Sequence, residues 1–342
     1  MERWLRAVLL GLFVGYVVHL FSQPSEEELD PTLVFQVLDK NGDGFLSLEE
    51  FLELQPVAAK AETVLTIYCL FTPLLTDTMD QDLEKASITL KGLLDWQAPF
   101  RNRTSLSRED IKALLPSQEI HPGDVWYMVE PEHIELDELS TRYTPTIPSK
   151  KTAAHTLHKV LSMFHPNVFI QTRFNPRGTV ATVRAQNSEF LDIVFRCHAE
   201  FQLNRSPLLP FWFTPAQFMG RLIVARNAST VVHFNMSVPS DRKLNVDMEW
   251  GSKLINGDME VDIGFIPQMK LEKIEKDNTS ATAIVWEEEI SLSNALDLLD
   301  RKMFPFKEVT YHPIERAVEL SLQHQLLLHC VVLWGALDDQ SC

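Results

Sequence analysis

The residues with the clearest chemical meaning lie between positions 39 and 50, where oxygen-bearing side chains recur at fixed spacing. The stretch reads Asp-Lys-Asn-Gly-Asp-Gly-Phe-Leu-Ser-Leu-Glu-Glu. A calcium ion binds roughly six to eight oxygen atoms, and a twelve-residue EF-hand loop supplies them from positions 1, 3, 5, 7, 9 and 12, with glycine at position 6. The stretch matches every one of these positions. It predicts a Ca²⁺ site with the ligands Asp39, Asn41, Asp43, Phe45 (through its backbone carbonyl), Ser47 and Glu50.

The flanking residues are those that such a loop requires. Gly44 supplies the backbone turn with positive φ that disfavours a side chain. Apolar residues at helical spacing precede and follow the loop, which predicts an entering and an exiting helix. Because the loop carries only three carboxylates, we expect weak affinity. A turn that binds no metal is the alternative.

A second stretch, 99–110, resembles the end of this loop. Leu106–Ile111 repeats the residue types of Leu46–Phe51, but Arg101 and Arg103 occupy positions where calcium ligands belong. The stretch is therefore either a degenerate second EF-hand that cannot bind calcium, or an ordinary helix start. In the second interpretation Ser107 caps the helix together with Asp110, three residues later.

The four cysteines, Cys69, Cys197, Cys330 and Cys342, are too far apart to form a zinc-ligand pair. Cys342 is the candidate redox residue. A predicted helix at 313–325 leads into the apolar run 326–334, which favours a strand buried on both faces, and then into a loop that ends in Cys342. A helix, a buried strand and a loop with cysteine are typical of thioredoxin-like folds, in which the next helix favours a thiolate.

Charge and length limit the possible functions. The 342 residues include 31 Lys and Arg against 47 Asp and Glu, which gives a net charge of −16. Such a balance argues against nucleic acid as a partner, because a phosphate backbone requires clustered cations. An acidic chain suits a calcium-rich compartment, although solubility alone accounts for it equally well.

The first 22 residues predict a signal anchor. Arg3 and Arg6 precede an apolar run from Ala7 to Phe21, and no good cleavage site follows it. Basic residues before the span and acidic residues after it place the body in the lumen of the endoplasmic reticulum (ER), in a single-pass topology. A cleaved signal peptide and a buried helix are the alternatives.

Glycosylation motifs agree with that orientation. The chain contains five Asn-x-Ser/Thr motifs, where chance would give about one or two, and they predict a lumenal glycoprotein. The acceptors are Asn102, Asn204, Asn227, Asn235 and Asn278.

The patterns of apolar residues predict an α+β fold. Helical spacing is expected over 57–98, 152–164, 292–303 and 313–325, and residues 168–289 contain short runs of β type. The expected organisation is an anchor (1–22), an EF-hand and helical region (23–114, calcium loop 39–50), a connector and helix (115–164), a β-rich domain (165–290) and an incomplete thioredoxin-like redox segment (291–342).

Several stretches carry a resemblance to a known family. Phe211–Phe218, Leu244–Trp250, Met259–Met269 and Trp334–Cys342 resemble the selenoprotein N family, and the similarity covers nearly the whole chain. In that family the last stretch continues with selenocysteine, which is encoded by UGA, so the resemblance implies a chain ended at that codon. Cys342 would then be half of a Cys–selenocysteine pair.

The resemblance also implies a function. It implies an ER membrane glycoprotein with a lumenal EF-hand that senses calcium, coupled to thiol or selenol redox protection of ER calcium handling in muscle. The implied partners are the ER membrane, the calcium pump and the ryanodine receptor. A non-catalytic calcium-binding scaffold or sensor is the alternative, because a single terminal cysteine cannot complete a redox cycle alone.

Overall fold

The computed structural model describes residues 62–79, 89–131, 145–172, 176–205, 208–239, 246–249, 259–260, 264–274 and 284–332. Contacts between residues divide the chain at Ala61, and all the described residues belong to the unit from Glu62 to Cys342. The predicted anchor at 1–22 and the predicted calcium loop at 39–50 lie outside the described residues.

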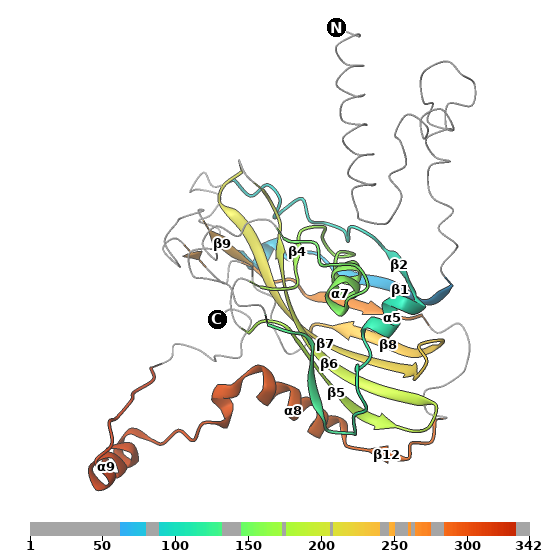
Figure 1. Cartoon of the computed structure of the whole chain (residues 1–342). Helices are drawn as coiled ribbons and strands as arrows, with labels where there is room; N and C mark the ends of the chain where they lie inside the picture. Colours follow the sequence, from blue (N-terminus) through green and yellow to red (C-terminus); the bar gives the residue numbers. More distant parts are fainter. Residues whose placement is uncertain are drawn as a thin grey trace, which may run out of the picture. The chain divides into compact units, whose positions relative to one another are not determined.

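A twelve-stranded sheet dominates the described residues, and its central path runs β12-β5-β6-β7-β8-β11-β1-β2 (Figure 1). Every strand pair in it is antiparallel. Strands β3, β4 and β9 pair with β5, β6 and β7, and β10 pairs with β9. The strands are β1 (Thr63–Thr72), β2 (Arg103–Ser107), β3 (Val125–Val129), β4 (Val168–Phe169), β5 (Thr179–Gln186), β6 (Phe190–Gln202), β7 (Phe211–Ala225), β8 (Val231–Ser237), β9 (Asp247–Glu249), β10 (Met259–Glu260), β11 (Gln268–Glu272) and β12 (Glu288–Glu289).

The α-helices lie between and after these strands. They are α5 (Arg108–Ala113), α7 (Ala153–Leu161), α8 (Leu292–Met303) and α9 (Ile314–His324), with short 3₁₀ turns η1 (Thr76–Thr78) and η3 (Pro305–Glu308). The predicted helices at 152–164, 292–303 and 313–325 are confirmed, as are the β runs between residues 180 and 260. The fold is a mixed α/β structure with a large antiparallel sheet.

The long strands β6 and β7 form the centre of the sheet, where they pair from Phe190↔Ala225 to Gln202↔Phe213. Successive side chains of a strand point to opposite faces. On one face of β6, Ile193, Phe195 and Phe201 join the main core, to which α7 contributes Leu157 and Leu161. The other face packs against α8. The aromatic stretch Phe211–Phe218 begins β7, and its large side chains are buried.

The second apolar cluster fixes α8 to the sheet. Ala295, Leu299 and Met303 recur at helical spacing on α8 and pack against Val180 of β5 and Val194 of β6. The packed sheet therefore has a main core on one face and a smaller one under α8 on the other.

The helix predicted over 57–98 is wrong for Thr63–Thr72, which form strand β1. This segment reads Thr-Val-Leu-Thr-Ile-Tyr-Cys-Leu-Phe-Thr and is rich in β-branched and aromatic residues, which fit a pleated surface better than a helix. Leu65 and Ile67 alternate into the core. Because β1, β2 and β3 join the same sheet as β5–β8, the sheet crosses the boundaries expected at residues 114 and 164.

The buried strand predicted at 326–334 is not formed by residues 326–332. They have no regular structure and are exposed, and Leu327 is as accessible as in an extended chain (101%). A strand needs a neighbour to satisfy its backbone groups, and no described strand pairs with this run. The helix of the expected thioredoxin-like segment is present as α9, but the described residues do not show such a fold.

No helix among the described residues is long and apolar enough to span a lipid bilayer.

The β6–β7 pairing predicts one sensitive position. Gly220 lies opposite Phe195, and a Cβ atom at Gly220 would fall 2.1 Å from Phe195 Cζ. We therefore expect Gly220→Ala to lower the free energy of unfolding by about 1–3 kcal/mol, the usual cost of an overpacked core. Urea denaturation of the variant would measure it. Combination with Phe195→Leu should recover part of the loss, whereas strict additivity of the two changes would contradict this explanation.

Candidate functional site

The sequence-predicted sites fall into two groups. The six calcium ligands, together with Cys342 and Asn278, lie outside the described residues. Asn102, Asn204, Asn227 and Asn235 lie within them. The part of the chain that the structure describes contains no group of three or more His, Cys, Asp or Glu side chains able to hold a metal ion. The calcium site at 39–50 lies outside these residues and stays a prediction.

The stretch 99–110 contains an ordinary helix start. Ser107 ends β2 and caps α5: its Oγ accepts a hydrogen bond from Asp110 N (3.2 Å), while Asp110 Oδ2 accepts one from Ser107 N (2.9 Å). These two bonds form a capping box and confirm that interpretation. Asp110 also pairs with Lys159 of α7 at 2.8 Å, so the cap joins the two helices.

A row of buried polar side chains lies on one face of β6. Because strand side chains alternate, these residues share the face opposite the main core. The row contains Asp192, Arg196, His198, Glu200 and Gln202, all buried. A buried charge without a partner costs free energy, so we expect each charged side chain of this row to bond specific partners. The alternation of polar and apolar residues from Arg196 to Gln202 is the sequence signal that could have predicted this row, although no site was predicted there.

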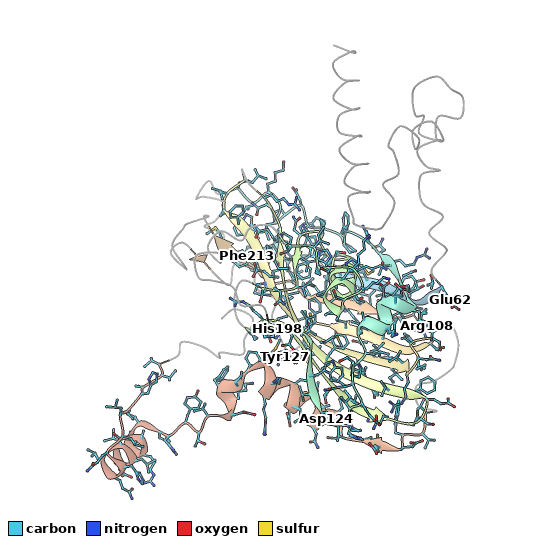
Figure 2. The ribbon with its side chains drawn as sticks, in the orientation of Figure 1. Glu62, Arg108, Asp124, Tyr127, His198 and Phe213 are labelled. Atoms are coloured by element: carbon cyan, nitrogen blue, oxygen red, sulfur yellow. The ribbon has the colours of Figure 1, made fainter. Side chains whose placement is uncertain are left out.

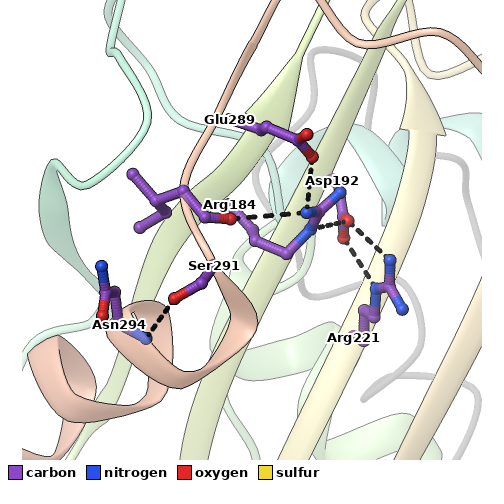
Figure 3. Close-up of polar contacts among 7 residues, drawn as sticks. Arg184, Asp192, Arg221, Glu289, Ser291 and Asn294 are labelled. Carbon is purple, nitrogen blue, oxygen red and sulfur yellow. Dashed lines mark hydrogen bonds and ion pairs between the residues drawn. The ribbon is translucent and has the colours of Figure 1, made fainter.

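The first member of the row fixes where α8 begins (Figure 3). Asp192 is fully buried and bonds Arg184 of β5 on one side and Arg221 of β7 on the other, where Arg221 Nη2 lies 2.8 Å from Asp192 Oδ2. Arg184 also donates to Glu289 Oε2 (3.0 Å) and to the backbone oxygen of Ile290 (3.4 Å). The next residue is Ser291, the N-cap of α8. Arg221 donates to both carboxylate oxygens of Asp192, from Nε (3.0 Å) and Nη2 (2.8 Å), and such a bidentate pair fixes the relative position of the two groups.

The second member, Arg196, lies under the other end of α8. Its Nη1 donates to Asp300 Oδ1 (2.8 Å), its Nε to His198 Nε2 (3.0 Å), and its Nη2 to Gln217 Oε1 of β7. The guanidinium also lies over the Phe304 ring, 4.6 Å from its centroid. Arg196 therefore joins the sheet to α8 through one carboxylate.

The surroundings of His198 determine its protonation state. Burial, and then the neighbouring Arg196 charge, hold the pKa of His198 well below its usual range, so the ring is neutral at pH 7 (His198 is labelled in Figure 2). A neutral imidazole can accept the hydrogen bond from Arg196. Lys307 of η3 adds a second cation, because its Nζ lies 2.6 Å from Asp300 Oδ2. Asp300 thus bridges two cations.

A cavity of about 500 Å³ opens beside this cluster, between α8–η3 and the β6–β7 pair. Its polar lining consists of Arg196, Gln217, Asp297, Asp300 and Lys307, and its apolar lining of Met219, Pro239 and Leu296. Small-molecule sites usually measure about 300–1,000 Å³ and combine apolar walls with a few polar groups. The cavity has both properties and is the candidate binding site within the described residues.

Two of the cysteines are unsuited to thiol chemistry. Burial raises the pKa of the Cys69 thiol and of the Cys197 thiol to about 12. The thiolate is the reactive form, and almost none is present at pH 7. Cys330 is exposed. The raised pKa makes the Cys69 and Cys197 thiols less reactive than an ordinary thiol at pH 7.

The four described glycosylation motifs differ in accessibility. Asn102 and Asn227 are exposed and Asn235 is half-buried on β8. Asn204 is only 5% exposed. Its Nδ2 donates to the backbone oxygen of Pro210 (2.8 Å), and its Oδ1 accepts from the backbone N–H of Trp212 (2.7 Å).

The chain also crowds the backbone around Asn204. A Cβ atom at Gly92 would lie 2.7 Å from both Asn204 Cβ and the Leu203 backbone oxygen. A sugar on Asn204 Nδ2 would have to replace these contacts. The Asn204 side chain therefore has a structural role in this fold, whatever its motif predicts.

We expect Asn204→Ala to lower the free energy of unfolding by about 1–3 kcal/mol, because the buried Trp212 amide loses its acceptor. Chemical denaturation would measure this change. Asn227→Ala is the control and should change stability by no more than about 0.5 kcal/mol, because its side chain is exposed. Glycopeptide mapping of the folded protein should find no sugar on Asn204, and a fully occupied Asn204 would refute the structural role.

Comparison with known proteins identifies several relatives. The chain is 37% identical to "Selenoprotein N" of Danio rerio over 365 residues, which covers 92% of this chain and 64% of that protein. It is 35% identical to "Selenoprotein N" of Mus musculus, with 92% and 64% covered, and 37% identical to "Selenoprotein N" of Homo sapiens, with 82% and 52% covered. The chain thus spans less than two thirds of the length of these relatives. No family model matches it, and no solved structure does.

Proposed function

Because the chain belongs to the selenoprotein N family, we propose that it is a calcium-binding membrane glycoprotein of the ER lumen. In this proposal it couples calcium sensing to thiol or selenol protection of ER calcium handling. The ER membrane, through residues 1–22, and proteins such as the calcium pump and the ryanodine receptor are the proposed partners.

The observation that carries the proposal is the loop at 39–50. Its ligand types are correct at all six coordinating positions, and Gly44 occupies the position that requires a tight turn. Calcium binding would reposition the two flanking helices, as it does in sensor loops. A site with few carboxylates would fill only at the high calcium concentrations of a store.

The proposed redox role depends on Cys342. Reduction of an oxidised cysteine in a partner protein takes two electrons, which Cys342 and a second thiol or selenol would supply by forming a bond with each other. An external dithiol would then reduce that bond. The raised pKa values of Cys69 and Cys197 disfavour them as the second group at neutral pH. A selenol is the better candidate because it ionises more readily than a thiol.

The same observation favours the second candidate function. A calcium-binding scaffold or sensor needs no reactive thiol, and the pKa values of Cys69 and Cys197 are raised. In that function the sheet and its exposed surfaces would bind partners under the control of the loop at 39–50.

We expect the purified lumenal body to bind calcium with a dissociation constant of about 10⁻⁴–10⁻³ M, the range of weak extracellular sites. Isothermal titration calorimetry would measure it. Asp39→Ala combined with Glu50→Ala should abolish binding, because the variant loses two of the three carboxylates of the predicted site. Glu49→Ala, one residue from a ligand, should leave binding unchanged. Equal calcium uptake by the double variant, or a submicromolar constant, would refute the proposed site.

A form of the protein with selenocysteine after Cys342 should reduce an oxidised model peptide at the expense of a dithiol reductant. Cys342→Ser should lose at least about 90% of this turnover, because the first bond could no longer be resolved within the protein. Cys330→Ser is the matched control, since Cys330 is also an exposed thiol in the C-terminal segment, and it should retain full turnover. Turnover absent from all forms, with calcium binding intact, would favour the scaffold function.

A further inference from the structure

The described helices leave part of the sheet uncovered. The face opposite the main core has α8 over β3, β5 and β6 (Figure 1). The helices α5 and α7 contribute Ile111 and Leu157 to the main core and so belong to the other face. Beyond β7 the sheet continues through β8, β11, β1 and β2. The outer face of these four strands is therefore a candidate contact surface.

The strand register arranges the side chains of this surface in two rows. On β1, Leu65 and Ile67 point into the main core, so the residues next to them point to the outer face. The first row runs Asn235 (β8), Glu272 (β11), Tyr68 (β1) and Arg103 (β2), and the second runs Ser237, Lys270 and Leu70. None of these seven side chains is buried, and together they form what we call the open face.

The open face combines apolar surface with polar groups. Tyr68 presents an aromatic ring, and Leu70 is 41% exposed. Lys270 Nζ lies 2.5 Å from Glu272 Oε2, and both side chains keep about 30% of their surface accessible. A sugar ring suits such a surface, because its C–H groups can cover an aromatic ring while its hydroxyls bond charged side chains.

Asn235, at the end of the first row, begins the motif Asn-Met-Ser. Its side chain is half-buried and forms no hydrogen bond with the described residues, whereas Asn204 Nδ2 donates to the backbone oxygen of Pro210. The folded strand can therefore accept a sugar on Asn235. Adjacent strands lie about 4.8 Å apart, which puts Tyr68 two strands and roughly 10 Å from Asn235. The first two sugars of an N-linked chain span a comparable distance.

We propose that Asn235 carries an N-linked oligosaccharide whose first two sugars lie on the open face, over Glu272 and against the ring of Tyr68. This inference rests on the lumenal glycoprotein part of the proposed function. The donor is a lipid-pyrophosphate oligosaccharide: its anomeric carbon forms a bond with Asn235 Nδ2, the bond from that carbon to the pyrophosphate breaks, and the amide loses one proton. The sugar covers apolar surface at Tyr68 and Leu70, so it stabilises the fold.

A double substitution tests the contact in full-length protein from mammalian cells. Ser237→Ala removes the glycosylation motif and leaves Asn235 in place. It should lower the melting temperature by about 2–4 °C when Tyr68 is present and have a smaller effect in a Tyr68→Ser background, because the sugar then has no ring to cover. Protein made in bacteria, which lack the donor, is the control, and there the two changes should be additive.

A second measurement does not depend on stability. In folded protein, Tyr68→Ser should speed the enzymatic release of the sugar from Asn235 about two- to tenfold, the range expected for loss of one aromatic contact. Release from Asn227 is the matched control, because this exposed residue lies in the turn between β7 and β8. Its rate should not change. Quantitative glycopeptide mapping over time would follow both sites in one sample.

Three results would overturn the proposal. Asn235 without sugar, in protein that carries sugar on Asn102 or Asn227, would refute this inference and leave the lumenal glycoprotein proposal intact. A chain without sugar on any motif would refute both. Additive effects of Tyr68→Ser and Ser237→Ala in the glycosylated protein, with an unchanged release rate at Asn235, would show that the sugar points into solvent.

Discussion

The rest of the structure depends on the antiparallel pairing of β6 with β7, which continues without a break from Phe190 to Gln202. Because side chains alternate along a strand, one pairing register determines two surfaces at once. One surface carries Phe195 and Phe201 into the main core, and the other carries Asp192 and Arg196 towards α8. A shift of one residue would exchange these faces and bury charges in the aromatic core. The register is therefore strongly determined.

The buried charges on this face of β6 position α8 more than they stabilise the fold. Buried ion pairs seldom stabilise a fold relative to apolar packing, yet removal of one partner costs about 3–5 kcal/mol. Asp192 joins β5, β6 and β7 and, through Arg184, the residues before α8. Arg196 then bonds Asp300 in the last turn of the same helix. These bonds hold both ends of α8 to the sheet, beside the cavity that α8 lines.

The proposed functions lie in different parts of the chain. The predicted calcium loop at 39–50 precedes the strands in the sequence, and Cys342 follows them. The exposed run 326–332 and the exposed apolar residues of α9 indicate a segment that lacks its packing partner among the described residues. The relatives extend well beyond the aligned region, and the chain covers 64% of two of them.

The sequence alone determined the elements whose signals are local. The helices at 152–164 and 292–303 follow from apolar spacing, and the runs in β5–β8 follow from the alternation of apolar and polar residues. The calcium site predicted at 39–50 rests on local spacing too, and it lies outside the described residues. The composition of Thr63–Thr72 allows a strand, but only the tertiary structure decided that it pairs with β11 and β2, because a strand's partners lie far away in the sequence. It likewise brought Arg196 beside Asp300, 104 residues away. No local pattern encodes that pair, because the energy of a buried charge depends on which partner the fold places beside it.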